Sequence, residues 1–140
     1  MARCMVTGGA GFIGSHLCRR LVDEGHDVRV LDNLSSGRRE NLAEIQDVVE
    51  FVEGDLCDEA LLAEVIQGVD CVLHHAAVAS VQTSVERPLF EQEVNAVGTL
   101  RLLEAARRVE VRRVVFAASA AACAFSKHPG PAQDISPSPI

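Results

Sequence analysis

Short runs of β-branched and other apolar residues alternate with helical patterns along this chain, and that alternation constrains its fold most. We expect strands at Cys4–Val6, Val28–Leu31, Val48–Val52, Val69–Leu73 and Val114–Ala117. Near-continuous apolar runs are typical of parallel strands buried on both faces. Parallel strands need crossover connections, which are right-handed and usually helical. The sequence therefore predicts an α/β fold with a doubly wound parallel sheet of five strands in the order 3-2-1-4-5.

Apolar residues at helical spacing fill the connections between these expected strands. The first helix should span about Ile13–Val22 and end before Gly25. A second should follow a candidate N-cap at Asp58. The longest should run from Leu89 to Arg108, and a weaker pattern at Arg38–Ile45 indicates a further short helix.

Length and composition fit one soluble domain. The 140 residues are 48% hydrophobic and 24% charged, which is ordinary for a globular protein. No apolar stretch reaches the roughly 18 residues of a membrane span, and no signal peptide is evident. The five cysteines form no Cys-x-x-Cys pair, so we expect free thiols and a cytoplasmic location. The formal charge of −7 makes nucleic acid a poor partner, because basic surfaces bind phosphate backbones.

A glycine-rich stretch, TGGAGFIG at residues 7–14, follows the first expected strand and opens the first helix. Read from Gly9 it has the spacing G-x-G-x-x-G, whose glycines allow a tight turn, close approach of a pyrophosphate and close helix–strand packing. The N–H groups of the helix N-terminus would face the phosphates. Plain strand-to-helix connections can also be glycine-rich, but the position of this one favours a nucleotide site.

Acidic residues end the next two strands. Asp32 lies where a carboxylate can accept hydrogen bonds from both hydroxyls of an adenosine ribose. It would repel a 2′-phosphate, so NAD is favoured over NADP, although Arg38 or Arg39 could reach such a phosphate. Asp55 could accept a hydrogen bond from the adenine amino group. Both acids have an alternative interpretation as turn residues, Asp32 beside Asn33 and Asp55 before the next helix.

The fourth strand ends in HHAA at residues 74–77. The small residues would let a cofactor ribose lie close to the backbone. Two adjacent histidines suggest metal binding or acid–base chemistry, but neighbouring side chains on an extended chain point to opposite sides. We therefore expect no metal site.

Together these segments resemble the extended short-chain dehydrogenase/reductase family, and within it the NAD-dependent nucleotide-sugar epimerases and dehydratases. The matching segments are TGGAGFIGSHL at 7–17, LDNLSSGRRENL at 31–42, GDL at 54–56, HHAA at 74–77, VNAVGTLRLLEAA at 94–106 and RRVVFAAS at 112–119. The UDP-hexose 4-epimerases look most similar. The resemblance implies a Rossmann fold, NAD as the cofactor and a UDP-hexose as the nucleotide-sugar substrate.

The resemblance also implies roles for individual residues. On the cofactor they are Gly8, Gly11, Phe12, Ile13 and Gly14 at the pyrophosphate, Asp32 and Asn33 at the ribose, Asp55 and Leu56 at the adenine, Ala76 and Ala77 along the nicotinamide, and Asn95 on the long helix. Ser80 and Ser84 would lie in the loop that lines the substrate cleft, or would serve only as loop caps. Ser119 matches the catalytic serine that hydrogen-bonds the reacting hydroxyl of the sugar.

The base that such enzymes use has no counterpart in this chain. In the family it is a Tyr in a Tyr-x-x-x-Lys helix, whereas these 140 residues contain no Tyr and only Lys127 as a lysine. We expect residues 1–122 to form the NAD-binding domain, residues 123–140 to form a Pro-rich loop or disordered tail, and the substrate domain to be missing. The chain would then be a truncated epimerase that is inactive alone. The alternatives are a non-catalytic NAD-binding module and the cofactor domain of a dehydratase or reductase.

The fifth strand, Val114–Ala117, should be an unprotected edge, because family members continue with further strands. Exposed apolar edges pair with other chains. We therefore expect self-association, as in a homo-oligomer, or poor solubility.

Overall fold

The computed structural model describes residues 1–118, so Ser119 and the expected tail at 123–140 lie outside the described residues. Five parallel strands form one sheet in the order β3-β2-β1-β4-β5, as predicted. The strands are β1 (Arg3–Thr7), β2 (Asp27–Asp32), β3 (Val49–Glu53), β4 (Cys71–His74) and β5 (Arg113–Phe116). Their boundaries differ from the expected ones by at most two residues at either end.

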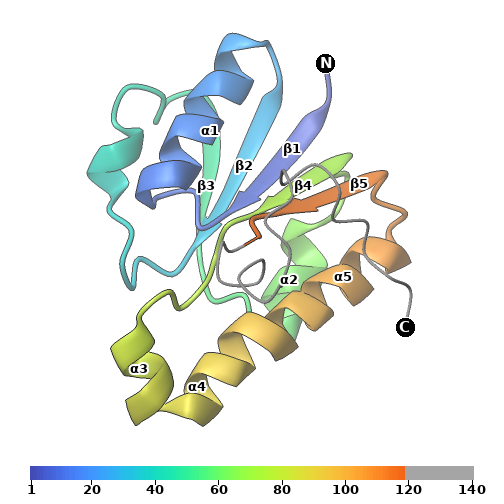
Figure 1. The fold of residues 1–140 in the computed structure, drawn as a ribbon. Helices are drawn as coiled ribbons and strands as arrows, with labels where there is room; N and C mark the ends of the chain where they lie inside the picture. Colours follow the sequence, from blue (N-terminus) through green and yellow to red (C-terminus); the bar gives the residue numbers. More distant parts are fainter. Residues whose placement is uncertain (119–140) are drawn as a thin grey trace, which may run out of the picture.

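Helices cover both faces of the sheet (Figure 1). On one face lie α1 (Phe12–Asp23) and the 3-10 turn η1 (Arg39–Leu42), and on the other lie α2 (Glu59–Val65) and α5 (Thr99–Arg108). Side chains alternate along each strand, so Met5 and Val6 enter opposite layers. The two buried clusters include Val6, Cys18, Val28, Val30 and Leu42 beneath α1 and η1, and Met5, Leu31, Leu62, Val72 and Leu102 beneath α2 and α5.

The described helices are short, and their ends follow signals in the sequence. The Asp58 carboxylate caps α2 by accepting hydrogen bonds from the backbone N–H groups of Ala60 and Leu61. Gly25 has a φ of +79°, the left-handed conformation that commonly follows the last turn of a helix. Within residues 1–118 no helix combines the length and the hydrophobicity that crossing a bilayer requires.

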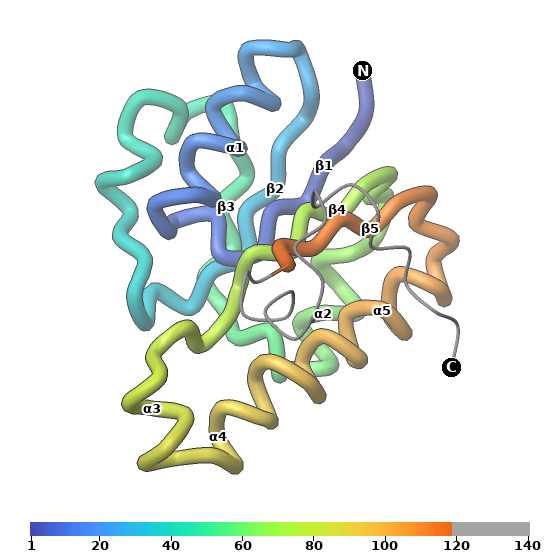
Figure 2. The backbone as a smooth tube through the Cα atoms, in the orientation of Figure 1, coloured from blue at the N-terminus to red at the C-terminus, as the bar shows by residue number. Residues whose placement is uncertain are grey.

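The long helix expected at Leu89–Arg108 has the predicted ends but a different interior. Here α4 (Pro88–Gln92) runs into a π-helical turn, η2 (Glu93–Gly98), which continues into α5. A further short helix, α3 (Val81–Glu86), precedes α4 (Figure 2). Hydrophobic periodicity over a short segment does not report a π turn, because the helical turns on either side keep their own spacing of about 3.6 residues. Such turns are rare and frequently lie at functional sites.

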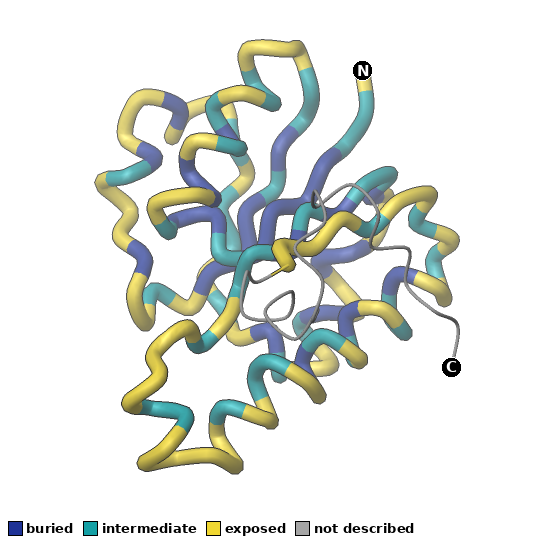
Figure 3. The backbone as a smooth tube through the Cα atoms, viewed as in Figure 1, coloured by how far each residue is buried: buried dark blue, intermediate teal, exposed yellow. Residues whose placement is uncertain are grey.

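The expectation that every strand is buried on both faces is wrong for the two outer strands, β3 and β5, neither of which contains a fully buried residue. Val115 is 45% exposed and Phe116 is 65% exposed, whereas Met5 and Val72 in the central strands are fully buried. In Figure 3 the buried positions concentrate in the central strands, and exposed positions run along β5, α3 and α4. Within the described residues β5 pairs only with β4, so it forms an edge of the sheet.

Candidate functional site

A cleft opens at the carboxyl ends of the parallel strands. In open α/β sheets ligands bind at this place, where neighbouring connections leave in opposite directions. The cleft brings together predicted site residues from four separate segments, namely Gly8, Gly11, Asp32, Asn33, Asp55, Leu56, Ala76 and Ala77. These segments follow β1, β2, β3 and β4 respectively.

Glycines at the first turn of the cleft let backbone segments touch. Gly8 has a φ of +70°, and a Cβ there would lie 2.7 Å from the backbone N of Ala76. Gly14 lies inside α1, where a Cβ would overlap the carbonyl oxygen of Gly8 and lie 2.8 Å from the Cα of Gly9. Gly8 and Gly11 line the cleft. Gly14 is buried away from the cleft wall and instead lets α1 pack against the loop.

The first turn of α1 presents backbone donors beside this loop. Gly11 precedes the helix in an extended conformation, and no side chain caps the helix start. Phe12 and Ile13 are exposed, and the N–H groups of this first turn have no partner within the helix. A helix N-terminus of this kind can bind an anion such as a phosphate.

Asp32 is almost fully buried and joins the glycine loop to the turn after β2. Its Oδ2 accepts a hydrogen bond from the backbone N of Ala10 at 2.9 Å, and its Oδ1 accepts one from the backbone N of Leu34 at 2.8 Å. Each carboxylate oxygen can accept a second hydrogen bond. The turn role and the predicted ribose contact are therefore compatible on one side chain.

Neither arginine that could reach a 2′-phosphate lines this cleft in the described part of the chain. Arg39 donates to Glu53 at 3.0 Å and lies over the Phe51 ring, 4.2 Å from its centroid. These contacts hold its guanidinium at the outer strand β3. The charged side chains on the cleft wall are therefore those of Asp32 and Asp55.

Asp55 shapes the turn after β3. Its carboxylate accepts hydrogen bonds from the backbone N of Cys57 at 2.8 Å and from the side-chain amide of Asn33 at 3.1 Å. The bond from Cys57 lowers the pKa of Asp55 most, and the bond from Asn33 adds to this against the opposing effect of partial burial. Asp55 is thus the turn residue of the alternative interpretation and also an ionised group on the cleft wall.

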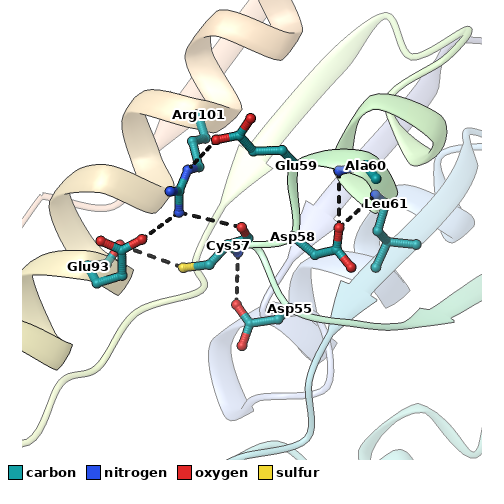
Figure 4. A network of polar contacts seen from close by, with 8 residues as sticks. All are labelled: Asp55, Cys57, Asp58, Glu59, Ala60, Leu61, Glu93 and Arg101. Atoms are coloured by element: carbon teal, nitrogen blue, oxygen red, sulfur yellow. Dashed lines mark hydrogen bonds and ion pairs between the residues drawn. The ribbon is translucent and has the colours of Figure 1, made fainter.

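Arg101 of α5 bridges the turn after β3, the start of α2 and the π turn η2 (Figure 4). It donates to Glu59 at 2.9 Å and to Glu93 at 2.6 Å, and it also reaches the carbonyl oxygen of Cys57 at 3.4 Å. The network therefore joins the turn between β3 and α2 to the π turn η2. Two segments that carry predicted site residues are held in a defined relative position by these contacts.

The segment after β4 lies between two clefts. His75, Ala76 and Ala77 line the cleft described above and also a second one on the β5 side. The second cleft is completed by side chains that include Thr99 and Phe116. The predicted nicotinamide contacts, Ala76 and Ala77, therefore lie between the first cleft and the second.

Asn95, which lies in η2, forms two hydrogen bonds to the backbone of this segment. Its Oδ1 accepts a hydrogen bond from the backbone N of Val78 at 2.8 Å, and its Nδ2 donates to the carbonyl oxygen of Val78 at 2.9 Å. Nδ2 also donates to Glu91 at 2.5 Å. Asn95 lines the second cleft, whereas Val78 lines the first. A direct contact of Asn95 with a cofactor stays a prediction.

Ser80 is the N-cap of α3, whereas Ser84 lies inside this helix and not in a loop. The Ser80 hydroxyl accepts a hydrogen bond from the backbone N of Thr83 at 3.1 Å, and the Ser84 hydroxyl donates to the carbonyl oxygen of Val81 at 2.6 Å. Neither lines the two clefts described above. The capping alternative describes the contact of Ser80 but not that of Ser84. A role of either serine toward substrate stays a prediction, as does the role of Ser119.

Sequence reasoning missed the structural role of His74. The residue is 7% exposed, with Nδ1 2.6 Å from the Thr7 hydroxyl and Nε2 2.9 Å from the Thr99 hydroxyl. Burial lowers the pKa of His74, and neighbouring His75 lowers it further, which favours the neutral ring. Within residues 1–118 no three His, Cys, Asp or Glu side chains are grouped to hold a metal ion. The available signal was strand alternation, which places His74 on the same face as buried Val72.

Comparisons with known proteins place these features in context. A family model described as "NAD dependent epimerase/dehydratase family" matches residues 4–139. The UDP-glucose 4-epimerase of Mycolicibacterium smegmatis is 52% identical over 122 residues, which cover 84% of this chain and 38% of that protein. A dTDP-glucose 4,6-dehydratase of Mycobacterium tuberculosis is 42% identical over 113 residues, or 79% of this chain and 34% of that protein.

A solved structure with a similar fold is the UDP-glucose 4-epimerase from Stenotrophomonas maltophila with bound NAD and formylated UDP-arabinopyranose. Its TM-score is 0.81 at 35% sequence identity, and the match covers 86% of this chain and 38% of that chain. The present chain therefore spans 38% or less of the length of these three relatives.

Proposed function

We propose that this chain, which belongs to the NAD dependent epimerase/dehydratase family, is the NAD-binding part of a nucleotide-sugar 4-epimerase of the UDP-hexose type. The observation that carries the proposal is the cleft where the glycine loop, Asp32 and Asp55 meet. It offers backbone donors for a pyrophosphate and carboxylates for a ribose and an adenine. The 52% identity to a UDP-glucose 4-epimerase supports the choice of sugar.

The residues of the cleft fit the adenosine half of NAD. Gly8 and Gly11 leave room for the pyrophosphate against the backbone, and the first turn of α1 donates to it. Asp32 would accept hydrogen bonds from the ribose hydroxyls and Asp55 one from the adenine amino group. A 2′-phosphate would lie against the Asp32 carboxylate, and charge repulsion would disfavour NADP. Arg39, held at β3, does not offset that repulsion.

In sugar 4-epimerisation NAD supplies a carrier that takes up a hydride and returns it. The protein must hold the sugar beside the nicotinamide and remove a hydroxyl proton with a base. Ala76 and Ala77 would lie along the nicotinamide, and Ser119 would orient the reacting hydroxyl. These 140 residues contain no Tyr to act as the phenol base. We therefore expect them to bind NAD without completing the epimerisation.

A sugar dehydratase is the second candidate. A dTDP-glucose 4,6-dehydratase is 42% identical over 79% of this chain. The residues proposed to hold the adenosine half of NAD would serve either reaction, so they do not discriminate between the two candidates. The UDP-hexose assignment is favoured by the higher identity to the epimerase.

Equilibrium titration with NAD and NADP tests the cofactor proposal. We expect tighter binding of NAD, and a smaller difference between the cofactors in Asp32→Ser. The matched control is Asp27→Ser at the opposite end of the same strand, where the carboxylate pairs with Arg3 instead. Equal affinity of the unmodified chain for both cofactors would contradict the role given to Asp32.

Turnover is tested by mixing the chain with NAD and UDP-galactose and measuring UDP-glucose. We expect none above background, because a missing general base alone costs about 10²- to 10⁴-fold in rate. Ser119→Ala is the control for any activity that arises. Turnover that this substitution abolishes would show that the reaction can proceed without a tyrosine.

A further inference from the structure

Two buried side chains, Thr7 and His74, and the partly buried Thr99 form a hydrogen-bonded network from the sheet into the helix layer. Thr7 and His74 are register partners on β1 and β4, and the Thr7 hydroxyl lies 2.6 Å from His74 Nδ1. On the other side of the ring, Nε2 lies 2.9 Å from the hydroxyl of Thr99, the first residue of α5. The Thr99 hydroxyl donates to the carbonyl oxygen of Asn95 at 2.6 Å.

The positions of the hydrogens in this network follow from counting donors. A carbonyl oxygen only accepts, so the single hydroxyl hydrogen of Thr99 is committed to Asn95. The Thr99 oxygen must then accept from His74 Nε2, which therefore carries a hydrogen. In a neutral ring Nδ1 is left as an acceptor, and the Thr7 hydroxyl donates to it.

The Thr7 oxygen is committed as well. It accepts from the backbone N–H of Ala76 at 3.2 Å, and from that of His75 at 3.3 Å as the longer branch of a bond that His75 also makes to the Thr7 carbonyl oxygen at 3.0 Å. A second hydrogen on the His74 ring, at Nδ1, would point at an oxygen that already accepts twice. The arrangement is therefore satisfied by one protonation state and one tautomer of His74.

These hydrogen bonds hold both ends of segment 75–78, and residues 75–77 line both clefts. At its start this segment is held by the Thr7 hydroxyl, and at its end Asn95 holds both backbone polar groups of Val78. Asn95 is in turn bonded to Thr99 through its carbonyl oxygen. Both anchors of the segment are therefore connected through His74 and Thr99.

We propose that His74 is a positioning residue: neutral and protonated at Nε2, it links Thr7 to Thr99 and thereby fixes segment 75–78 against the bound NAD. The proposal rests on the proposed NAD binding. In the described part of the chain the contacts of the His74 ring are the two threonine hydroxyls, and the titratable group that acts on it is adjacent His75.

The tautomer of His74 tests the hydrogen-bonded network without any ligand. Imidazole ¹⁵N chemical shifts of the ligand-free chain at neutral pH should show a neutral ring with the hydrogen on Nε2. A ring protonated on both nitrogens, or a hydrogen on Nδ1, would overturn the proposal.

Thr99→Val tests the link to NAD, because it keeps the side-chain shape and removes the acceptor of the His74 Nε2–H. An unsatisfied buried donor should weaken NAD binding about tenfold and release the tautomer preference. Thr99→Ser keeps the hydroxyl and should bind NAD as the unmodified chain does. Normal NAD affinity in a folded Thr99→Val variant would refute the positioning role.

The pH profile of NAD affinity provides a second measurement if Thr99→Val does not fold. Affinity in the unmodified chain should fall as the ¹⁵N signals report protonation of His74. The matched control is His26→Gln, which removes a histidine near the N-terminus, beside Ala2 and Glu24, and should leave the profile unchanged. Affinity that stays constant while His74 becomes protonated would overturn the proposal. If the unmodified protein binds no NAD, the proposed function is refuted. The tautomer of His74 would still decide whether the hydrogen bonds from Thr7 through His74 to Thr99 form as described.

Discussion

Replacing Gly14 with Ala should destabilise the protein although it places a good helix former inside α1. In an exposed helix Gly→Ala stabilises by about 1 kcal/mol. Here the new Cβ would overlap the carbonyl oxygen of Gly8 and lie 2.9 Å from the carbonyl carbon of the same residue. Both contacts are to backbone atoms of the loop, which cannot rotate away as a side chain can.

The size of the effect follows from these two opposing contributions. Overpacking of a tight site costs about 1 to 3 kcal/mol, and contact with several backbone atoms places Gly14→Ala at the upper end, about 3 kcal/mol. Subtracting about 1 kcal/mol for helix propensity leaves a net loss of about 2 kcal/mol in the free energy of unfolding. The same shift would displace Gly8, which lines the cleft, and so weaken NAD binding.

Gly25→Ala is the matched control. Its left-handed φ of +79° makes Ala unfavourable by about 1 to 2 kcal/mol, but a Cβ there meets no other atom within 4 Å. Urea unfolding should therefore show similar losses for both variants, whereas titration should show weaker NAD binding only in Gly14→Ala. A Gly14→Ala chain as stable as the unmodified one, or with unchanged NAD affinity, would refute this packing argument.

Two further predictions concern pH and association. Because burial lowers the pKa of His74 and of His75 in the folded state, the unfolded chain binds more protons as the pH falls below about 6.5. The free energy of unfolding should therefore be highest above that pH and should decline as the pH falls toward the lowered pKa values of the folded state. Urea unfolding midpoints that stay constant through this range would contradict the lowered pKa values of the two histidines. Val115→Lys should reduce self-association, since a charge on the edge strand β5 blocks pairing between sheets. Sedimentation velocity measures this, and an unmodified chain that stays monomeric at high concentration would show that the edge does not associate.

Local sequence patterns were sufficient for the parallel sheet and its strand order, and they located residues that line one cleft. Alternating patterns and right-handed crossovers indicate a doubly wound sheet, and the glycine-rich loop after the first strand favours the order 3-2-1-4-5 among such sheets. The glycine loop and Asp32 could be located because parallel strands all end at the same edge of the sheet. The family membership and NAD as the cofactor of that family, both predicted from these segments, are confirmed. The domain boundary at residue 122 and the catalytic role of Ser119 stay predictions.

The tertiary structure alone decided how the segment after β4 is held. The hydrogen bonds between Asn95 and Val78 and the two hydrogen bonds of His74 join residues that are far apart in the chain. The sequence shows a histidine doublet and a helical asparagine, but their partners depend on the distance between β1, β4 and α5 after packing. Hydrophobic patterns specify which face of an element is buried, whereas a buried polar group is specified by the donor or acceptor that packing brings within reach.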